Sequence, residues 1–474
     1  MRPASAALAV AAVLMSAGPA AAHAFGARYD LPLPLGFYLG AAGLAVVASF
    51  LGAVAFLRTG HAGRVTFDMP IPPRIAAAVH RALIIVGLAT ITVVLATAFL
   101  GPAQAMRNFA TITVWVLWWV GFLLLSGLAV ELWPGVDPFR GAYRLICQFA
   151  GRNPEVGAFV LPRQAGWLAP AGLLAIAWVE LVSDWSEDPR ALGIMILLYL
   201  AFSLTAGAAF GLRWFREADP LGRLFELVGR IAPVSAPRPA ALELRLPGEG
   251  LLKDAGRHPG EVMLVVCLIG TVLFDGLSET PAWAAVLDSV SRSVNLRGIL
   301  LWLRDAGVDL LKLIQTLGLI STIAAFLGLF LALAWGMRRA ARTSLSTAEV
   351  AAAFASTLMP IAIAYHLSHY VSYLLIAGQL IVPAVSDPLG SGWNLFGTAR
   401  DTIDVGVIGA KQVWWIAVVT LVAGHTLSVL ISHRRALAIF GDTRRAATSQ
   451  LPMAAAMVGL TACSLWILSQ PITE

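Results

Sequence analysis

The sequence predicts an all-α integral membrane protein, a polytopic helical bundle of about ten transmembrane helices that follows an N-terminal signal peptide. Three observations favour this class. Of the 474 residues, 58% are hydrophobic and only 13% are charged, with a mean hydropathy of +0.79. Uncharged runs of about 20 residues, long enough to cross a bilayer, recur along the whole chain. Basic residues gather in alternate loops, as they do when those loops share the cytoplasmic side.

Residues 1–24 have the pattern of a secretory signal peptide. Arg2 precedes an apolar stretch over residues 6–15, and small residues follow up to Ala24. This order of basic, apolar and small residues predicts cleavage after Ala22 or Ala24. An uncleaved first anchor is less favoured, because the apolar stretch is short for a spanning helix. The mature N-terminus is therefore expected outside the cytoplasm.

The rest of the chain, residues 25–474, is expected to be a single transmembrane domain. The predicted spans cover residues 35–57, 80–101, 109–131, 166–183, 191–212, 260–278, 307–336, 350–382, 408–432 and 452–469. The longest connection, about residues 214–258, contains several prolines and lacks a sustained apolar period. It predicts a loop with one short amphipathic helix near residues 221–231.

Loop charge predicts the orientation of the spans. With the mature N-terminus outside, every strongly basic loop falls on the cytoplasmic side. The opposite loops are acidic or mixed, as at residues 184–188, 275–288 and 387–404. After ten crossings the C-terminus returns to the periplasmic side. The membrane explains the net charge of +6, and we do not expect nucleic acid as a partner.

Several common functional signatures are missing from the sequence. The three cysteines, Cys147, Cys267 and Cys463, are far apart and odd in number, which disfavours a disulfide framework or a zinc ribbon. The chain contains no GxxxxGK[ST] phosphate loop and no CxxCH haem-attachment motif. The sequence therefore disfavours direct coupling to ATP and a covalently attached haem.

Histidines within apolar spans are the main chemical signal. His366 and His369 lie one helical turn apart in one span, and His425 lies in the next. Titratable groups at membrane depth cost free energy and are usually kept for metal binding, proton handling or substrate binding. Positions three apart differ by about 60° around a helix, so His366 and His369 share a face that Tyr370 extends. Pro360 removes a backbone hydrogen bond before the pair and is expected to kink the helix.

These histidines also have a plainer interpretation, as hydrogen-bonding residues of the bundle or of an outer aromatic interface. Counting along the spans places His366 in the outer half and His425 nearer the inner half. Carboxylates near the outer ends of spans, Asp275, Glu279 and Glu180, are candidates to join imidazoles around a divalent metal. Their plainer interpretation is a solvated helix end.

Certain segments of the chain resemble a known family in the same span order. They are residues 23–35, the turn Phe274-Asp275-Gly276-Leu277-Ser278, and residues 360–373 together with Gly424-His425. On these segments the chain resembles bacterial inner-membrane proteins described as fenitrothion hydrolases. The resemblance implies a multi-pass inner-membrane enzyme that hydrolyses a phosphotriester such as fenitrothion to a dialkyl thiophosphate and a nitrophenol.

Taken with the residues, the resemblance implies metal-assisted chemistry, in which a divalent ion activates water and polarises the phosphorus centre. We expect His366, His369 and His425 as metal ligands, and Asp275 and Tyr370 as catalytic groups. An apolar organophosphorus substrate partitions into lipid, so the lipid bilayer is both a partner and a route to the site. A second membrane subunit is a further partner that the sequence leaves open.

Two other classes stay open. A transporter or metal-handling membrane protein without hydrolase activity would spread polar residues, such as Lys312 and His425, along a path across the membrane. A hydrolase would instead cluster them with Asp275 on one side. A cytochrome-like protein would hold haem between His366 or His369 and His425, against which the difference in depth argues.

Overall fold

The computed structural model describes residues 33–57, 66–238, 240–253 and 260–470. Of the residues that the structure describes, 77% are helical, and ten helical segments among them are long and apolar enough to cross a membrane. The predicted class, an all-α polytopic bundle, is therefore confirmed at this level. The predicted signal peptide and the first of the segments that carry the family resemblance lie, almost entirely, outside the described residues.

The ten segments follow the order and approximate positions predicted from hydropathy. They are α2 (Leu35–Phe56); α3 (Pro73–Leu100); α4 (Phe109–Thr111), the π-helix η3 (Ile112–Phe122) and α5 (Leu123–Leu128) as one span; η4 (Arg163–Trp167) with α8 (Leu168–Leu181); α9 (Pro189–Phe210); α12 (Glu261–Ser278); α15 (Leu310–Ala341); α16 (Thr347–Phe354), η7 (Ala355–Leu358), α17 (Met359–Ala377), η8 (Gly378–Leu380) and α18 (Ile381–Ser386) as one span; α19 (Ala410–Phe440); and α20 (Thr443–Leu468).

Shorter elements connect these spans. They are η2 (Ala105–Arg107), α6 (Trp133–Val136), α7 (Pro138–Phe149), η5 (Asp184–Ser186), α10 (Leu212–Glu217), α11 (Pro220–Gly229), η6 (Glu249–Leu252), α13 (Pro281–Arg292), α14 (Val294–Asp305) and the strands β1 (Thr66–Pro70), β2 (Val234–Arg238) and β3 (Ala241–Arg245).

Four helices run at least five residues further at one end than hydropathy predicted, and all four of these extensions carry arginines. The helix α3 begins at Pro73 rather than 80, and α20 begins at Thr443 rather than 452. The helices α15 and α19 end later than expected, at Ala341 and Phe440. Arginine is a good helix former whose aliphatic stem packs on apolar surface while its head stays in water, so a helix continues past the apolar window that a hydropathy average detects.

The long connection at residues 214–258 is more ordered than expected. It contains the predicted short helix, as α11, but also a hairpin whose strand β3 pairs antiparallel with both β2 and β1. The helix α11 is not a surface helix, because Leu224, Phe225 and Leu227 are fully buried. Strands this short leave no clear period in the sequence, and β1 lies in a different loop, so only the folded chain reveals the sheet.

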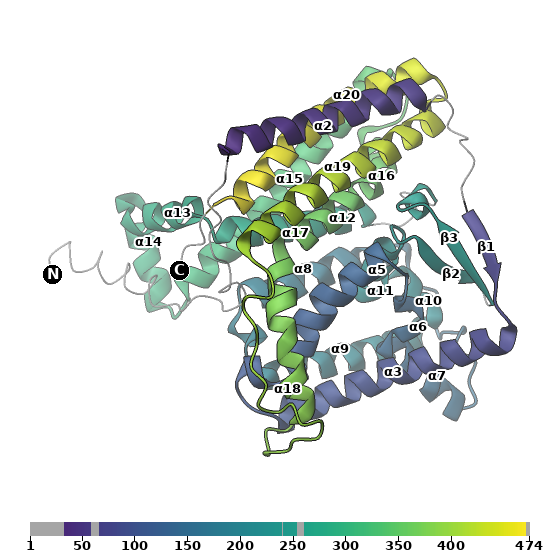
Figure 1. The fold of residues 1–474 in the computed structure, drawn as a ribbon, viewed down its shortest axis with the longest axis vertical. Coiled ribbons are helices and arrows are strands. Elements are labelled where there is room, and N and C mark those ends of the chain that lie inside the picture. Colours follow the sequence, from purple (N-terminus) through teal and green to yellow (C-terminus); the bar gives the residue numbers. More distant parts are fainter. Residues whose placement is uncertain (1–32, 58–65, 239, 254–259, 471–474) are drawn as a thin grey trace.

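The sheet defines one pole of the bundle, and α13 with α14 defines the other (Figure 1). Strand pairing joins loops that follow the first and fifth spans, and an ion pair between Arg434 and Glu249, 2.6 Å, adds the ninth span to this sheet pole. At the α13–α14 pole, Lys312 pairs with Asp184 at 2.5 Å. Loops predicted to share a side therefore meet at the same pole. That the sheet pole faces the cytoplasm stays a prediction from charge.

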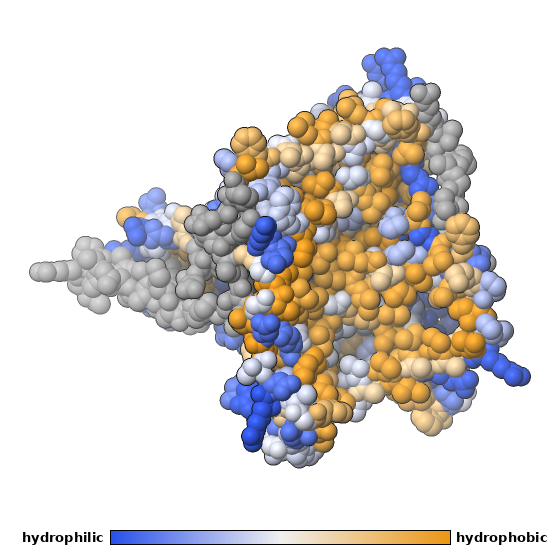
Figure 2. All heavy atoms as spheres, viewed as in Figure 1, coloured by the Kyte–Doolittle hydropathy of each residue, from blue (hydrophilic) through white to orange (hydrophobic). Residues whose placement is uncertain are grey.

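Apolar residues dominate the surface between the poles, and hydrophilic residues gather toward its two sides (Figure 2). Exposed large side chains such as Leu44, Ile85 and Leu198 lie on the outer helices α2, α3 and α9. The two central spans are those of α17 and α12, in which 83% and 72% of the most apolar window is buried, against 56% or less elsewhere. A lipid-facing exterior and a protein-facing core are the arrangement expected of a bundle in a bilayer. The central pair carries the candidate site.

Candidate functional site

Pro360 starts a helix rather than kinking one. The span that contains it is interrupted at η7, and α17 begins again at Met359, which places Pro360 within the first turn. Proline is tolerated there because the first N–H groups of a helix have no intrahelical partner. The predicted mid-helix kink is therefore replaced by a break between two helices. The break directs α17, with its histidines, into the centre of the bundle.

Two glycines allow neighbouring helices to approach α17. A Cβ atom at Gly424 of α19 would lie 2.4 Å from the Cβ of Ala364 and 2.8 Å from the carbonyl oxygen of Pro360. A Cβ atom at Gly276 of α12 would lie 2.9 Å from the Tyr365 hydroxyl. Helices in membranes pack closely where small residues face each other. Both glycines belong to the segments that carry the family resemblance, and both serve the packing of α17.

Asp275, His369 and Tyr370 form a buried hydrogen-bonded cluster. The Nε2 atom of His369 lies 3.0 Å from Oδ2 of Asp275, and both side chains are only 5% exposed. The hydroxyl of Tyr370 donates to the same carboxylate oxygen. An ionised carboxylate only accepts hydrogen bonds, so His369 donates from Nε2 when Asp275 is ionised. Two donors thus satisfy a carboxylate inside a membrane span, where an unpaired charge is costly.

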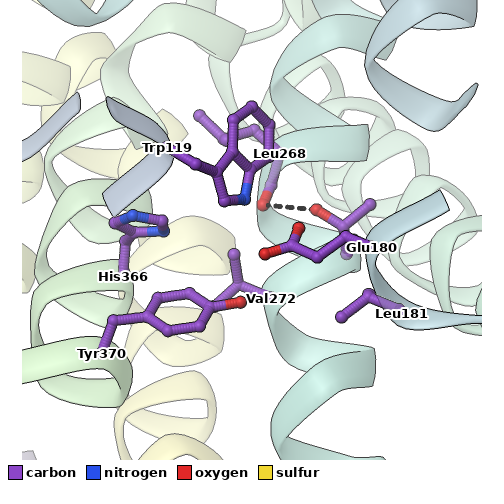
Figure 3. A pocket seen from close by; sticks show the side chains of 8 residues that line it. Trp119, Glu180, Leu181, Leu268, Val272, His366 and Tyr370 are labelled. Carbon is purple, nitrogen blue, oxygen red and sulfur yellow. Dashed lines mark hydrogen bonds between the residues drawn. The ribbon is translucent and has the colours of Figure 1, made fainter. Parts of the chain in front are cut away.

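Beside this cluster lies a small cavity that His366 shares with Glu180 (Figure 3). Its wall is made by Trp119, Glu180, Leu181, Leu268, Thr271, Val272, His366 and Tyr370. Its volume of about 10 Å³ corresponds to roughly one water molecule. Figure 3 shows the Glu180 carboxylate, the Tyr370 hydroxyl and the His366 ring pointing toward the same space. Tyr370 belongs to both the cavity and the Asp275 cluster, so the two are continuous.

His366 is the unusual side chain of the cavity. It is 2% exposed, and neither ring nitrogen makes a hydrogen bond of acceptable geometry with the residues that the structure describes. The backbone of Trp119 faces the ring without completing such a bond. A buried polar group without a partner is destabilising and therefore uncommon in folded proteins. His366 thus differs from His369, one turn away, which binds Asp275.

His425 does not join the other two histidines. Its Nδ1 lies 2.8 Å from the Leu421 carbonyl oxygen of its own helix. The span of η7 and α17 runs antiparallel to α19, and Ser428 of α19 donates to the carbonyl of Thr357 in η7 at 2.6 Å. This register places His425 near the level of Pro360. That level is roughly 9 Å from His366 and roughly 14 Å from His369 along the helix axis. Within the described part of the chain, no group of three or more His, Cys, Asp and Glu side chains is placed to hold a metal ion.

Other expected residues have positions of their own. Glu279 lies at the C-cap of α12, one turn beyond Asp275. Lys312 is bound to Asp184 at the α13–α14 pole and is not part of the cavity wall. The sequence made Glu180 a candidate to join imidazoles around a metal, with a solvated helix end as its plainer interpretation, and did not single out Trp119. The sequence feature that marks Glu180 is an acidic residue within an otherwise apolar run. No sequence feature distinguishes Trp119 from the other aromatic residues of its span.

These features define the class of the protein, a polytopic α-helical membrane protein with a buried polar cluster beside a cavity in the half of the bundle nearer α13 and α14. Comparison of the chain with protein-family models, curated proteins and solved structures found no match. Its function is therefore argued from the site itself.

Proposed function

We propose that the chain is a membrane-embedded hydrolase of apolar phosphotriesters such as fenitrothion, located in the bacterial inner membrane with both termini on the periplasmic side. One observation carries the proposal. Segments that share the family resemblance, separated by more than 90 residues in sequence, meet around α17, where Asp275 binds His369 and Tyr370. Gly276 and Gly424 let the neighbouring helices come close enough for this meeting. Convergence of the resemblance on one buried polar cluster supports a shared chemical role.

The cluster offers a route for the proton of an attacking water. In the proposed reaction, the oxygen of a water in the cavity forms a bond to phosphorus, and the bond from phosphorus to the aryl oxygen breaks. The nitrophenol leaves as its phenolate. The proton of the water passes to the Tyr370 oxygen as the Tyr370 proton moves to Asp275, which His369 holds in place. General base catalysis of this kind contributes a factor of about 10² to 10⁴.

Substrate reaches such a site from lipid. A neutral triester is apolar, and the bundle presents an apolar exterior between its poles (Figure 2). The cavity holds about one water, so binding of a whole triester requires the helices that line it to separate. Movements of this kind are common in enzymes that open to admit substrate.

A second function is favoured by the size of the same cavity. A small space of about 10 Å³ beside ionisable groups suits an ion or a proton, as expected of a transporter or metal-handling protein without hydrolase activity. Lys312, proposed for the path of a transporter, is instead bound at the α13–α14 pole. Asp275, His369 and Tyr370 lie together beside the cavity that His366 and Glu180 line, which supports the hydrolase as the first proposal.

Fenitrothion hydrolysis by membranes that contain this chain alone tests the proposal. We expect nitrophenol release, and a loss of at least about 100-fold in the His366→Ala and His369→Ala variants at equal expression. The matched control is His425→Gln, a buried histidine outside the cluster, which retains activity. Correctly inserted protein without hydrolysis would contradict the hydrolase proposal and favour the transporter. Activity that requires a second membrane protein would identify the subunit that the sequence leaves open.

A further inference from the structure

We propose that the cavity binds one divalent transition-metal ion between the imidazole of His366 and the carboxylate of Glu180. This inference deepens the proposed function and rests on it for the role of the ion in hydrolysis, although binding itself is measured separately. It replaces the set of three histidines predicted from the sequence by a pair that the fold brings together from α17 and α8.

His366 is the first line of evidence. Its ring is buried, borders the cavity and leaves both nitrogens without a hydrogen-bond partner among the described residues. A neutral imidazole carries one lone pair in the plane of the ring, which a metal ion accepts. Metal binding would satisfy one of the two nitrogens, and the neighbouring backbone of Trp119 is placed to orient the other. His369 is already engaged by Asp275 and is the weaker ligand.

Glu180 is the second line of evidence. It lies in the last turn of α8, and Figure 3 shows its carboxylate directed into the cavity from the side opposite His366. The wall between them is largely apolar, through Leu181, Leu268 and Val272. A carboxylate at this depth is stabilised in its charged form by a nearby cation. The pair therefore supplies one nitrogen and one oxygen ligand to the same space.

The ligand chemistry selects the class of ion. A nitrogen and carboxylate-oxygen set suits Zn²⁺, Co²⁺, Mn²⁺ or Fe²⁺, whereas Ca²⁺ and Mg²⁺ favour oxygen ligands alone. No thiolate lines the cavity within the described residues, which disfavours Cu⁺. Its volume of about 10 Å³ fits a single ion. Two protein ligands leave positions for water and for the phosphoryl or thiophosphoryl group, as a hydrolytic metal site requires.

Titration of the purified full-length chain with Co²⁺, followed by calorimetry and visible absorption, tests this site. We expect one ion per chain, with affinity reduced at least tenfold in His366→Gln and in Glu180→Gln. The matched controls His425→Gln and Glu187→Gln change a histidine and a glutamate away from the cavity and should bind as the wild type does. Wild-type protein that binds no stoichiometric Co²⁺, or variants that bind as tightly as the wild type, would overturn the proposal.

A measurement on the wild type avoids any dependence on the folding of variants. Pulsed electron paramagnetic resonance of the Mn²⁺-loaded protein detects nitrogen nuclei bonded to the metal. A signal from one imidazole supports the site, and its absence overturns it. Stoichiometric binding without fenitrothion hydrolysis would leave the metal site standing and contradict the hydrolase. Hydrolysis that survives chelator, with no metal bound, would contradict the metal site and leave the hydrolase standing.

Discussion

Buried carboxylates occur in two regions of this protein, and their hydrogen bonds differ in origin. Near the sheet pole, Asp137 and Asp219 cap the N-termini of α7 and α11 by accepting backbone N–H groups one turn ahead. Tyr199 also donates to Asp219, at 2.6 Å. In the central spans, Asp275 lies within a helix and accepts from side chains of α17 more than 90 residues away.

The difference separates architecture from candidate chemistry. A capping carboxylate satisfies the exposed N–H groups of its own helix and stabilises it by about 1 kcal/mol. A carboxylate inside a helix caps nothing, so its burial calls for another explanation. Tyr370, a partner of Asp275, lines the cavity, whereas Asp137 is not among the residues that line it. Burial of an acid alone is therefore a poor guide to function, and the source of its hydrogen bonds is a better one.

The largest effect is expected on activity. Asp275→Asn keeps the volume of the side chain but removes the negative charge and the proton acceptor, so hydrolysis should fall by about 100-fold or more. Initial rates in membranes at equal expression measure this. The matched variant Asp137→Asn should retain the wild-type rate, because asparagine also caps helices. Equal losses in both variants would erase the distinction between the two regions.

The next effect is expected on stability. Gly424→Ala places a Cβ atom 2.4 Å from the Cβ of Ala364, so α17 and α19 must move apart. Overpacking of this kind destabilises by about 1–3 kcal/mol, which thermal unfolding in detergent detects. Gly298→Ala in α14 is the control, since a Cβ atom there meets nothing within 4 Å. We expect a small stabilisation from it, because alanine is the better helix former. A neutral Gly424→Ala would show that close packing does not position the cluster.

Stability should also depend on pH through the capping region. Burial, together with the nearby Asp219, raises the pKa of Asp137 to about 7, and burial raises the pKa of Asp219 to about 6. A carboxyl with a raised pKa in the folded protein binds its proton more tightly when folded. Its stabilising effect is therefore complete below about pH 4 and is lost as the pH rises toward 7.

We expect the free energy of unfolding of the purified protein to fall by several kcal/mol between about pH 4 and 7, because a change in the pKa of Asp137 from 3.8 to about 7 corresponds to roughly 4 kcal/mol. Asp137→Asn removes the titrating group but keeps the cap, so it should flatten this slope. A slope that is unchanged in Asp137→Asn would assign the pH dependence to other groups. Both profiles come from thermal unfolding measured across the pH range.

The smallest effect is expected at the surface ion pair of Lys312 and Asp184. Lys312 is 32% and Asp184 82% exposed, so Lys312→Ala should change stability by less than about 1 kcal/mol. Its rate of fenitrothion hydrolysis should equal that of the wild type. Loss of function in this variant, measured at equal expression, would favour a path that crosses the membrane and weaken the idea of one clustered site.

Sequence patterns identified part of the candidate site and missed the rest. The spacing of His366 and His369 predicted a shared helical face, and the outer-end position of Asp275 made it a candidate partner. Within that part, the contact between Asp275 and His369 is present in the structure. Glu180 was one of three carboxylate candidates to join the imidazoles, and Trp119 was not singled out. The sequence could not show that both border the cavity with His366, because their helices are distant in sequence and no periodicity relates one helix to another. His425 was expected to join His366 and His369, but it lies at another level of the bundle.

The sequence by itself determined the class, the number and order of the spans, and the grouping of loops at two poles, because these depend on the apolar length of each segment and on loop charge. Only the tertiary structure decided that Asp275 meets His369 and Tyr370, that Glu180 faces His366, and that strands from two loops form a sheet. The reason is physical. Span formation is a local property of about 20 residues in lipid, whereas the rotation and register of each helix depend on packing against neighbours from anywhere in the chain.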